Sequence, residues 1–572
     1  MNQIDTNNTV VMTTSLEEKS NQDPKTVAEV MEVTTNHVDG ALQETSLENT
    51  DEAIIEGRPK KSLSFKLAFI GLAASMFVFQ MDATSLGIAL PTVAEELHGE
   101  SLQSFWANMS YTLCGLVMQP LWASISDVFG RKPSFYICMA FFFIGSIVFA
   151  LAKDMNTIIV GRVLQGFGGG GIDVLVEIIL SDITTLKERS FYLGLMAIPN
   201  AVGNILGPSI GAIFSNYASW RWIGWVNLPI LGISAPLIVF FLHLRPVELD
   251  EKLSTNLKKL DWIGMMLVVT GITIFVLPLS WAGSLFPWKS WQTLLPILLG
   301  AALLVIFVVY EAKPNVPILP HRLFHSRTAN MTLAAAFVHG MILISLLQYL
   351  PLFYQAVELE TAIRSAVSLL PTVIISVVFA AISMMMVSVV GGYVWIIRFG
   401  WIIIILGTGL LALFDVGSSP SLLFGLPILW GMGVSLLRLL LLPIQASVKN
   451  VDDTGLAIGL LLTIRMFGGL IGLTVASTIF NSVFSTSIAS VELTGSLSQL
   501  HNPSKAVSFI PELRSLEISP KILDAVLRVY LGCFKTIFYT MAGFGGLGLV
   551  TSLFTEDLDL NRKDVGQQRF EE

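Results

Sequence analysis

The residues of this chain best suited to chemistry are ionisable side chains that stand inside long apolar runs. Asp82 lies within the apolar run 66–90, and Arg162 lies within the run 156–181. Charges in hydrocarbon are costly, so they usually face a partner or a water-filled path. Counted at ~1.5 Å per residue along two helices, both side chains reach a similar depth. We therefore expect Asp82 and Arg162 to face one central cavity and to be coupled electrostatically. The alternative is that each snorkels or serves packing.

Two further carboxylates and two arginines also stand inside apolar runs. Asp173 and Glu177 are four residues apart and share one face of a helix. Two close carboxylates raise each other's proton affinity, which predicts a proton-sensitive site. The alternative is structural, with Glu177 solvated near the headgroups or capping a loop. Arg438 and Arg465 should each meet a carboxylate, helix carbonyls or an anionic part of a substrate.

The glycine-rich stretch GRVLQGFGGGGIDVLVE, residues 161–177, contains G-x-G-x-x-G. A dinucleotide fingerprint needs a strand, a turn and a helix around it, and this stretch lies inside an apolar run. We interpret the glycines as small residues that let membrane helices approach closely. The three cysteines show no metal or disulfide spacing, no catalytic motif is present, and no cofactor is expected.

The composition defines the elements that must position these residues. The chain is 53% hydrophobic and 13% charged, far from the ~25% charged residues of soluble domains. This predicts an all-α polytopic membrane protein, since a spanning helix needs ~20 mostly apolar residues. Fourteen segments qualify: 66–90, 104–124, 134–152, 156–181, 191–214, 221–244, 261–282, 292–310, 329–354, 365–389, 393–414, 420–446, 455–484 and 529–553.

The ends and the loops complete the predicted organisation. Residues 1–65 form an acidic leader with few aromatic residues, which we expect to be disordered. Lys and Arg concentrate in alternate loops, so both termini, including the tail 554–572, are expected to be cytoplasmic. The one long loop on the outer side is expected at 485–528.

Several stretches resemble the major facilitator superfamily. ASISDVFGRKP is similar to its cytoplasmic signature G-x-L-A-D-R-x-G-R-K, with Ala123 in place of glycine and Val128 in place of a basic residue. The resemblance implies a state-dependent latch between helix ends on the cytoplasmic side. Its residues are Asp127, Gly130, Arg131 and Lys132.

Two more motifs bear on coupling and gating. Arg162, Gln165 and Gly166 match the superfamily's R-x-x-Q-G pattern, in which the arginine is implicated in proton coupling. GNILGPSIG, residues 203–211, resembles the G-x-x-x-G-P-x-x-G signature of antiporters. Spacing by four places its glycines on one helix face for close packing, and the proline removes a backbone hydrogen bond, which predicts a tight hinge that seals the pathway. The hinge residues are Gly203, Gly207, Pro208 and Gly211.

Four further stretches are similar to the fourteen-spanning drug:proton antiporters, especially fungal ones. They are MDATSLGIALP, WRWIGWVNLP, LDWIG and residues 443–472. The resemblance implies two six-helix bundles, 66–244 and 329–553, with two inserted helices in 261–310. It also implies substrate binding between the bundles and alternating access driven by protons. No nucleotide-binding P-loop is present.

The expected function is proton-coupled efflux of small amphipathic organic molecules, such as a secondary metabolite, toxin or drug. Asp82, Arg162, Asp173 and Glu177 are the candidates for proton coupling. The candidate cavity residues are Gln165, Phe79, Tyr111, Gln348, Tyr354 and Arg465.

The expected partners are protons, a small molecule and the lipid bilayer, with no nucleic acid. We expect a monomer in the cell membrane or the vacuolar membrane. Two alternatives stay open: an importer of the same fold, for siderophores or basic amino acids, and a membrane sensor without transport.

Overall fold

The structure, a computed structural model, describes residues 61–99, 101–247, 253–282, 286–314, 316–491, 493, 495–501, 506–514, 519–560 and 568–571. Most of the predicted acidic leader, residues 1–60, lies outside the described residues. The description below concerns the compact unit Ser64–Glu572.

The first group of helices, which we call the N-terminal half, comprises α3 (Leu63–Glu96), α4 (Ser101–Phe129), α5 (Arg131–Ala150), α6 (Met155–Ile183), α7 (Leu186–Tyr217), α8 (Trp222–Trp225) and α9 (Asn227–Phe241). A short helix and a helical hairpin follow: α10 (Leu253–Lys259), α11 (Trp262–Trp281) and α12 (Trp291–Tyr310).

The remaining helices, which we call the C-terminal half, are α13 (Arg327–Ala356), α14 (Ala362–Ser368), α15 (Leu370–Val390), α16 (Val394–Leu410), α17 (Pro420–Leu436), α18 (Leu441–Ala446), α19 (Thr454–Ile488) and α20 (Pro520–Leu553). Short 3₁₀ segments complete it: η1 (His321–His325), η2 (Leu411–Leu413), η3 (Leu437–Leu440), η4 (Val451–Asp453), η5 (Gly495–His501) and η7 (Glu512–Arg514). The described residues contain two isolated β-bridges, Leu244–Phe570 and Ala282–Phe286, outside any named strand.

The predicted spans coincide with helices throughout. Among the described residues, thirteen helices are long and apolar enough to cross a membrane. The fourteenth predicted span is α4, which has 29 residues and packs between α6 and α19. Polar residues such as Gln119 and Ser126 lower its hydropathy, and they are buried in the interior. α20 begins at Pro520 and α19 continues to Ile488, so the connection predicted at 485–528 is shorter than expected.

Local sequence explains where several helices begin. Asp154 accepts a hydrogen bond from the Thr157 N–H at the start of α6, and Thr185 does the same for Glu188 at the start of α7. Such side-chain caps satisfy backbone N–H groups that a helix start leaves without partners. α5 is different, because Gly130 before it has no side chain to serve as a cap.

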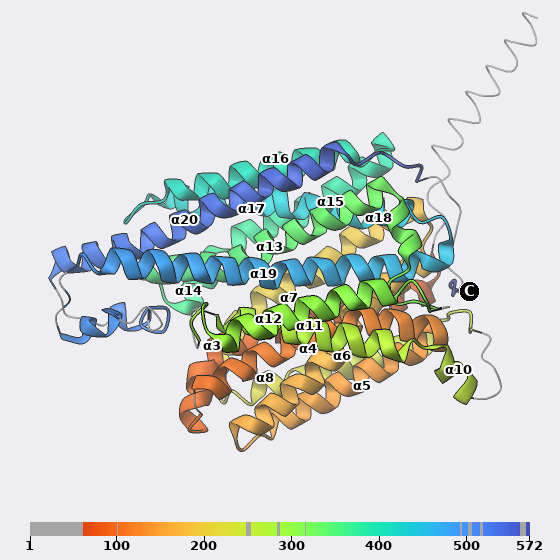
Figure 1. Cartoon of the computed structure of the whole chain (residues 1–572), viewed down its shortest axis with the longest axis horizontal. Helices are drawn as coiled ribbons and strands as arrows, with labels where there is room; N and C mark the ends of the chain where they lie inside the picture. Colours follow the sequence, from red (N-terminus) through yellow and green to blue (C-terminus); the bar gives the residue numbers. More distant parts are fainter. Residues whose placement is uncertain are drawn as a thin grey trace, which may run out of the picture. The chain divides into compact units, whose positions relative to one another are not determined.

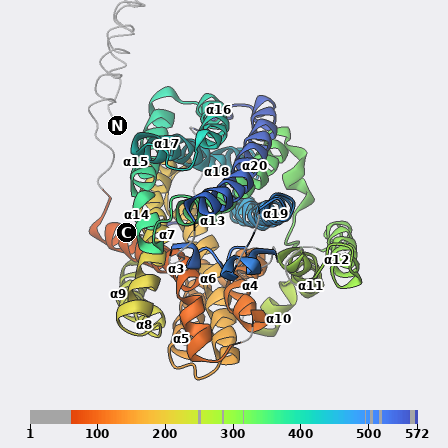
Figure 2. The ribbon, with the colours of Figure 1, turned by 90° about the vertical axis from the view of Figure 1, so that its left-hand side faces the viewer.

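The helices pack as two groups with the hairpin at their seam. In the N-terminal half α6 packs between α4 and α5, and in the C-terminal half α13 packs against α19 and α20 (Figure 1). The halves meet through α4 with α19, α6 with α19, and α7 with α15. In Figure 2, α11 lies beside α4 and α19, and α12 lies outside it. Only 17% of an 18-residue apolar stretch of α12 is buried inside the protein, as expected for a helix that faces lipid.

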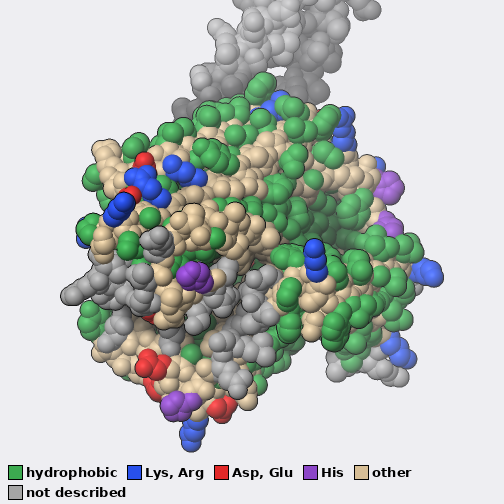
Figure 3. Space-filling view, turned by 60° about the vertical axis from the view of Figure 1, so that its left-hand side comes forward, with side chains coloured by type: hydrophobic (Ala, Val, Ile, Leu, Met, Phe, Trp, Pro, Cys, Tyr) green, Lys and Arg blue, Asp and Glu red, His purple; other side chains and the backbone are tan. Residues whose placement is uncertain are grey.

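Apolar side chains cover much of the outer flank of the helices, seen as the green areas of Figure 3. We call the end of the helices that carries Asp127 and Arg131 the Arg131 end, and the opposite end the Arg364 end.

The glycine-rich run belongs to α6, where glycines permit close contact: a Cβ at Gly168 would lie 2.6 Å from the Phe142 nitrogen. The nucleotide-loop reading is therefore excluded by the fold.

Candidate functional site

Asp82 and Arg162 form a direct ion pair inside the N-terminal half. The Arg162 Nη1 lies 2.6 Å from the Asp82 Oδ2, and both side chains are fully buried. The pair joins the middle of α3 to the third turn of α6. The two residues therefore share one location, and that location is enclosed by the N-terminal half instead of open to a cavity.

A shell of polar side chains holds the Asp82 carboxylate. The Gln165 Nε2 donates to the Asp82 Oδ1 at 3.2 Å, and the Asn227 Nδ2 donates to the same oxygen at 2.8 Å. Both amides also contact the Ser146 Oγ at 3.1 Å. Three helices, α3, α6 and α9, thus meet at one carboxylate, and Ser146 of α5 holds the two amides.

An aromatic side chain closes the other side of Arg162. Its Cζ lies 4.1 Å from the centre of the Tyr111 ring, within the range of a cation–π interaction. The Tyr111 hydroxyl donates to the Phe79 carbonyl at 2.9 Å, and the two rings stack. Phe79, Tyr111 and Gln165, predicted to line a cavity, instead lie buried around the ion pair.

The predicted glycine seam of α7 packs directly on α3 beside the ion pair. A Cβ at Gly203 would lie 2.7 Å from the Phe77 carbonyl oxygen, and one at Gly207 would lie 2.5 Å from the Met81 carbonyl oxygen. Gly211 approaches the Ser85 carbonyl even more closely. The seam therefore contacts the turn of α3 that carries Asp82. α7 runs as one helix through Pro208.

Asp173 and Glu177 lie where the two halves meet. The Gln119 Nε2 donates to the Asp173 Oδ2 at 2.7 Å, and Arg438 of η3 approaches the Glu177 Oε1 at 3.4 Å. The Glu177–Arg438 pair thus bridges the two halves. Arg465 of α19 interacts electrostatically with both carboxylates, is partly exposed and has no ion pair within 4 Å among the described residues.

The predicted latch residues gather at the Arg131 end. The Arg131 guanidinium pairs with Asp127, and its Nε lies 3.0 Å from the Asp182 Oδ2. The start of α19 packs on this cluster, since a Cβ at Gly455 would lie 2.6 Å from the Arg131 Nη2. Lys132 is partly exposed and instead donates to the Val239 carbonyl at 3.2 Å, within the N-terminal half.

Further contacts hold the halves together at this end. The Arg189 Nη1 of α7 donates to the Gln445 Oε1 of α18 at 2.6 Å. Ala123, which stands where the superfamily signature has glycine, faces a glycine on the other helix: a Cβ at Gly459 would lie 2.8 Å from the Ala123 Cβ. The close approach of α4 and α19 is therefore kept despite that departure.

At the Arg364 end a cavity of about 900 Å³ opens between the halves. It is lined by Ile88 and Thr92 of α3, by the last turns of α7, and by Thr361, Ile363 and Arg364 at the start of α14. Contacts close one end of the interface and a cavity occupies the other.

The remaining predicted cavity residues lie in the C-terminal half. Gln348 of α13 is exposed. Tyr354 is fully buried, and its hydroxyl donates to the Leu423 carbonyl of α17 at 2.5 Å, so a hydrogen bond links α13 to α17.

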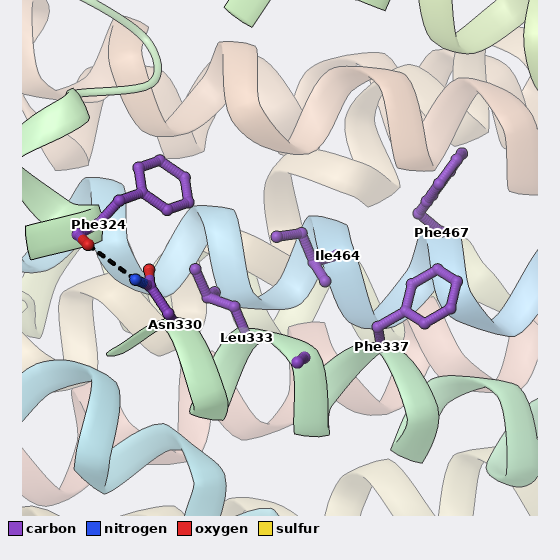
Figure 4. Close-up of a pocket in the computed structure, with 7 residues that line it drawn as sticks. Phe324, Asn330, Leu333, Phe337, Ile464 and Phe467 are labelled. Atoms are coloured by element: carbon purple, nitrogen blue, oxygen red, sulfur yellow. Dashed lines mark hydrogen bonds between the residues drawn. The ribbon is translucent and has the colours of Figure 1, made fainter. Parts of the chain in front are cut away.

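A smaller apolar pocket of about 460 Å³ lies between α13, α19 and η1 (Figure 4). Its walls include Leu333, Phe337, Ile464 and Phe467, and the Asn330 side chain donates to the Phe324 carbonyl at its edge. It contains none of the predicted site residues.

Sequence reasoning missed three residues that complete these clusters. Asn227 stands inside the quoted stretch WRWIGWVNLP, and Gln119 lies in the least apolar span, so each had a visible signal. Gln568 had none: it lies in the C-terminal tail, and its Oε1 accepts a hydrogen bond from the Arg131 backbone N–H at 2.8 Å.

Two helical halves joined by contacts at one end, parted by a cavity at the other, and carrying a buried ion pair define a polytopic membrane transporter. The chain belongs to the Major Facilitator Superfamily, which matches residues 72–473. It is therefore a transporter and not an enzyme, and thirteen helices among its described residues are long and apolar enough to cross a membrane.

Named relatives agree with this assignment. The chain is 72% identical to the MFS-type transporter sphD of Aspergillus fumigatus, over 92% of each chain. It is 32% identical to the efflux pump FUS6 of Gibberella moniliformis, over 88% of this chain and 89% of that one. The fold resembles that of the proton:xylose symporter XylE, with a TM-score of 0.56 at 11% identity, over 87% of this chain and 97% of that one.

Proposed function

We propose that the chain exports small amphipathic organic molecules in exchange for protons by alternating access. The observation that carries this proposal is the fully buried Asp82–Arg162 pair with its shell of Gln165, Asn227 and Ser146. Ionisable residues at such depth are expensive and are usually functional. The names of relatives such as FUS6 support export as the direction.

The coupling step we propose begins at Asp82. A proton on its carboxyl would neutralise it and weaken the pairing with Arg162, leaving the cation to Gln165 and the Tyr111 ring. The α7 glycine seam rests on the same turn of α3, so a shift of this turn would pass to α7. α7 in turn contacts α15 of the other half, which offers a route from proton to bundle movement.

The cargo path we propose runs between the halves. Residues 66–244 and 329–553 are assigned as the moving bundles, and 261–310 as the inserted helices. Arg465, Asp173 and the Glu177–Arg438 pair lie at the interface and offer charged groups to a cargo. The cavity at the Arg364 end would be the outer opening of this path.

The excess of Lys and Arg in loops at the Arg131 end supports a cytoplasmic location for that end. Under this assignment the structure is closed toward the cytoplasm and open toward the outside.

Purified protein in vesicles tests the proposal. Rhodamine 6G, an amphipathic dye, should move when a pH step is imposed, and movement should stop in Asp82→Asn. Lys289→Gln, which alters an exposed cation between α11 and α12, serves as the control. Dye movement that ignores the pH step would defeat proton coupling, and movement only toward the Arg131 side would favour an importer.

A further inference from the structure

The C-terminal tail is bound to both halves of the transporter. Directly after α20, the Asp557 Oδ1 accepts hydrogen bonds from the Tyr393 and Val394 N–H groups at 2.8 and 3.0 Å, at the start of α16. The Tyr393 hydroxyl donates to the Glu556 carbonyl. This part of the tail is fixed to the C-terminal half.

The last described residues are instead fixed to the N-terminal half. The Arg245 N–H donates to the Arg569 carbonyl at 3.0 Å, and the Glu571 N–H donates to the His243 carbonyl at 2.9 Å. Leu244 and Phe570 form an antiparallel bridge between them. The chain that ends the second half thus pairs with the chain that leaves α9.

Phe570 anchors this contact by its side chain. Its ring packs edge-on against Phe65 of α3 at 5.6 Å and lies 6.4 Å from the His243 ring. Phe65 also packs against Tyr192 of α7. One aromatic residue of the tail therefore contacts the Arg131 ends of α3 and α9.

Gln568 contacts the Arg131 cluster. α5 lacks a local side-chain cap, and the Gln568 Oε1 supplies one by accepting the Arg131 N–H at 2.8 Å. Gln568 is only 5% exposed. Arg131 is the residue whose guanidinium gathers Asp127 and Asp182 and on which α19 packs.

We propose that the side chains of Gln568 and Phe570 are part of a gate at the Arg131 end: Gln568 positions Arg131, and Phe570 fastens the tail of the C-terminal half to the N-terminal half. Opening that end separates the halves, and we infer that the tail then leaves one of its two anchor sites. The N-terminal anchor consists of three hydrogen bonds and one ring, and it is the part that releases. The inference rests on alternating access, but not on the cargo or on proton coupling.

State populations provide the first test and require no cargo. Ile363→Cys, in the cavity at the Arg364 end, is labelled with a membrane-impermeant maleimide in protein whose native cysteines are replaced. Phe570→Ala and Gln568→Ala should lower the labelling rate. If the closed gate is favoured about 10:1 and each variant costs ~1.4 kcal/mol, the ratio becomes about 1:1 and the rate falls to about half.

Arg569→Ala is the matched control, because it removes an exposed side chain from the same stretch and keeps the backbone contacts. Its labelling rate should stay at the wild-type value. Equal rates in all variants would overturn the gate role. If labelling responds but dye never moves in vesicles, the proposed cargo or coupling fails while the gate role stands.

A cross-link provides the second test. Leu244→Cys with Phe570→Cys places two thiols at bridge-paired positions, where Cβ atoms lie ~4.5–5.5 Å apart. Oxidation should stop transport of rhodamine 6G and preserve Ile363→Cys labelling, and a reductant should restore transport. If the cross-linked protein transports as fast as the same protein after treatment with the reductant, the tail stays bound throughout the cycle, which contradicts the proposal.

Discussion

At the scale of single residues, the Asp82–Arg162 ion pair is costly to bury, and both carboxylate oxygens of Asp82 have hydrogen-bond or ion-pair partners. The Asp82 Oδ1 accepts from Gln165 and Asn227 while Oδ2 pairs with Arg162. Removing one member of a buried pair leaves an uncompensated charge, which costs ~3–5 kcal/mol, whereas removing both can be nearly neutral. A stabilising role and a coupling role therefore give different mutant patterns.

Asp82→Asn and Arg162→Gln should each lower the yield and melting temperature of the purified protein, with a loss of ~3–5 kcal/mol. The double variant should recover much of that stability because no charge is left unpaired. Dye transport driven by a pH step should be absent in all three. Thermal melts and vesicle flux measure the two properties separately, and a double variant that transports normally would remove the pair from the mechanism.

The sequence was enough to single out Asp82 and Arg162 as candidate functional residues, but not to predict the side chains that surround them. Asp82 and Arg162 stood out because ionisable groups in apolar runs need a reason. Their direct contact depended on helix packing, and Asn227 and Ser146 join the cluster from helices whose neighbours no spacing rule fixes. An open cavity was expected and a sealed pair was found, because Tyr111 covers the guanidinium.

At the scale of elements, apolar length predicted the helices well, and tertiary contact decided their ends. α20 begins at Pro520, earlier than expected, because its first turns carry Lys521, Asp524 and Arg528 and do not read as apolar. The α7 seam was expected to seal a pathway, but its partner helix, α3, could not be read from the sequence.

Gly207→Ala tests this seam. The added Cβ would lie 2.5 Å from the Met81 carbonyl oxygen, so α3 and α7 must separate, at a cost of about 1–3 kcal/mol. Gly87→Ala in α3 is the matched control, since no atom lies within 4 Å of its added Cβ. Melting temperatures of the two variants should differ clearly. Equal values would mean that the seam is looser than these contacts indicate.

The hairpin carries its own titratable group at the Arg131 end. The Asp261 Oδ1 accepts from the Gly264 N–H, and the Glu311 Oε2 accepts from the Leu319 N–H at 3.0 Å. Burial raises the pKa of Glu311 to about 7; the Asp261 carboxyl acts in the same direction, while the Leu319 N–H opposes it. A native pKa above the unfolded value of 4.5 means that the folded protein binds the proton more tightly.

This contribution to stability is present in full below about pH 4.5 and is lost as pH rises through about 7. Glu311→Gln should therefore raise the melting temperature at pH 8 by about 2 °C and change it little at pH 5. Glu95→Gln, which alters an exposed glutamate, should change neither value. A Glu311→Gln effect of equal size at both pH values would point to packing instead of titration.

At the scale of the whole molecule, the two ends of the interface differ. Three contacts join the halves at one end, while a cavity of about 900 Å³ lies at the other. The contacts are the Arg189–Gln445 hydrogen bond, the packing of Gly455 on Arg131 and the close approach of Gly459 to Ala123. The latch at Arg131 stays a prediction from the sequence motifs, and these motifs did not predict that α19 and the C-terminal tail contact Arg131. A lone Phe570 in a polar terminus gives no periodic signal.

A disulfide across the closed end should therefore trap the transporter. In protein without its native cysteines, Ala123→Cys with Gly459→Cys places two Cβ atoms 2.8 Å apart across the halves, and a small shift reaches the ~3.5–4.5 Å of a disulfide. Oxidation should abolish flux of rhodamine 6G in vesicles, and a reductant should restore it, because rocking must part α4 from α19 at this point.

The control pair is Ala150→Cys with Gly224→Cys, whose Cβ atoms lie 2.9 Å apart but both belong to the N-terminal half. A disulfide there joins α5 to α8, which move as one body if each half rocks as a unit. Its flux should survive oxidation. Loss of flux in both pairs would mean that the N-terminal half deforms internally during transport, and survival in both would mean that the closed end is not where the path opens.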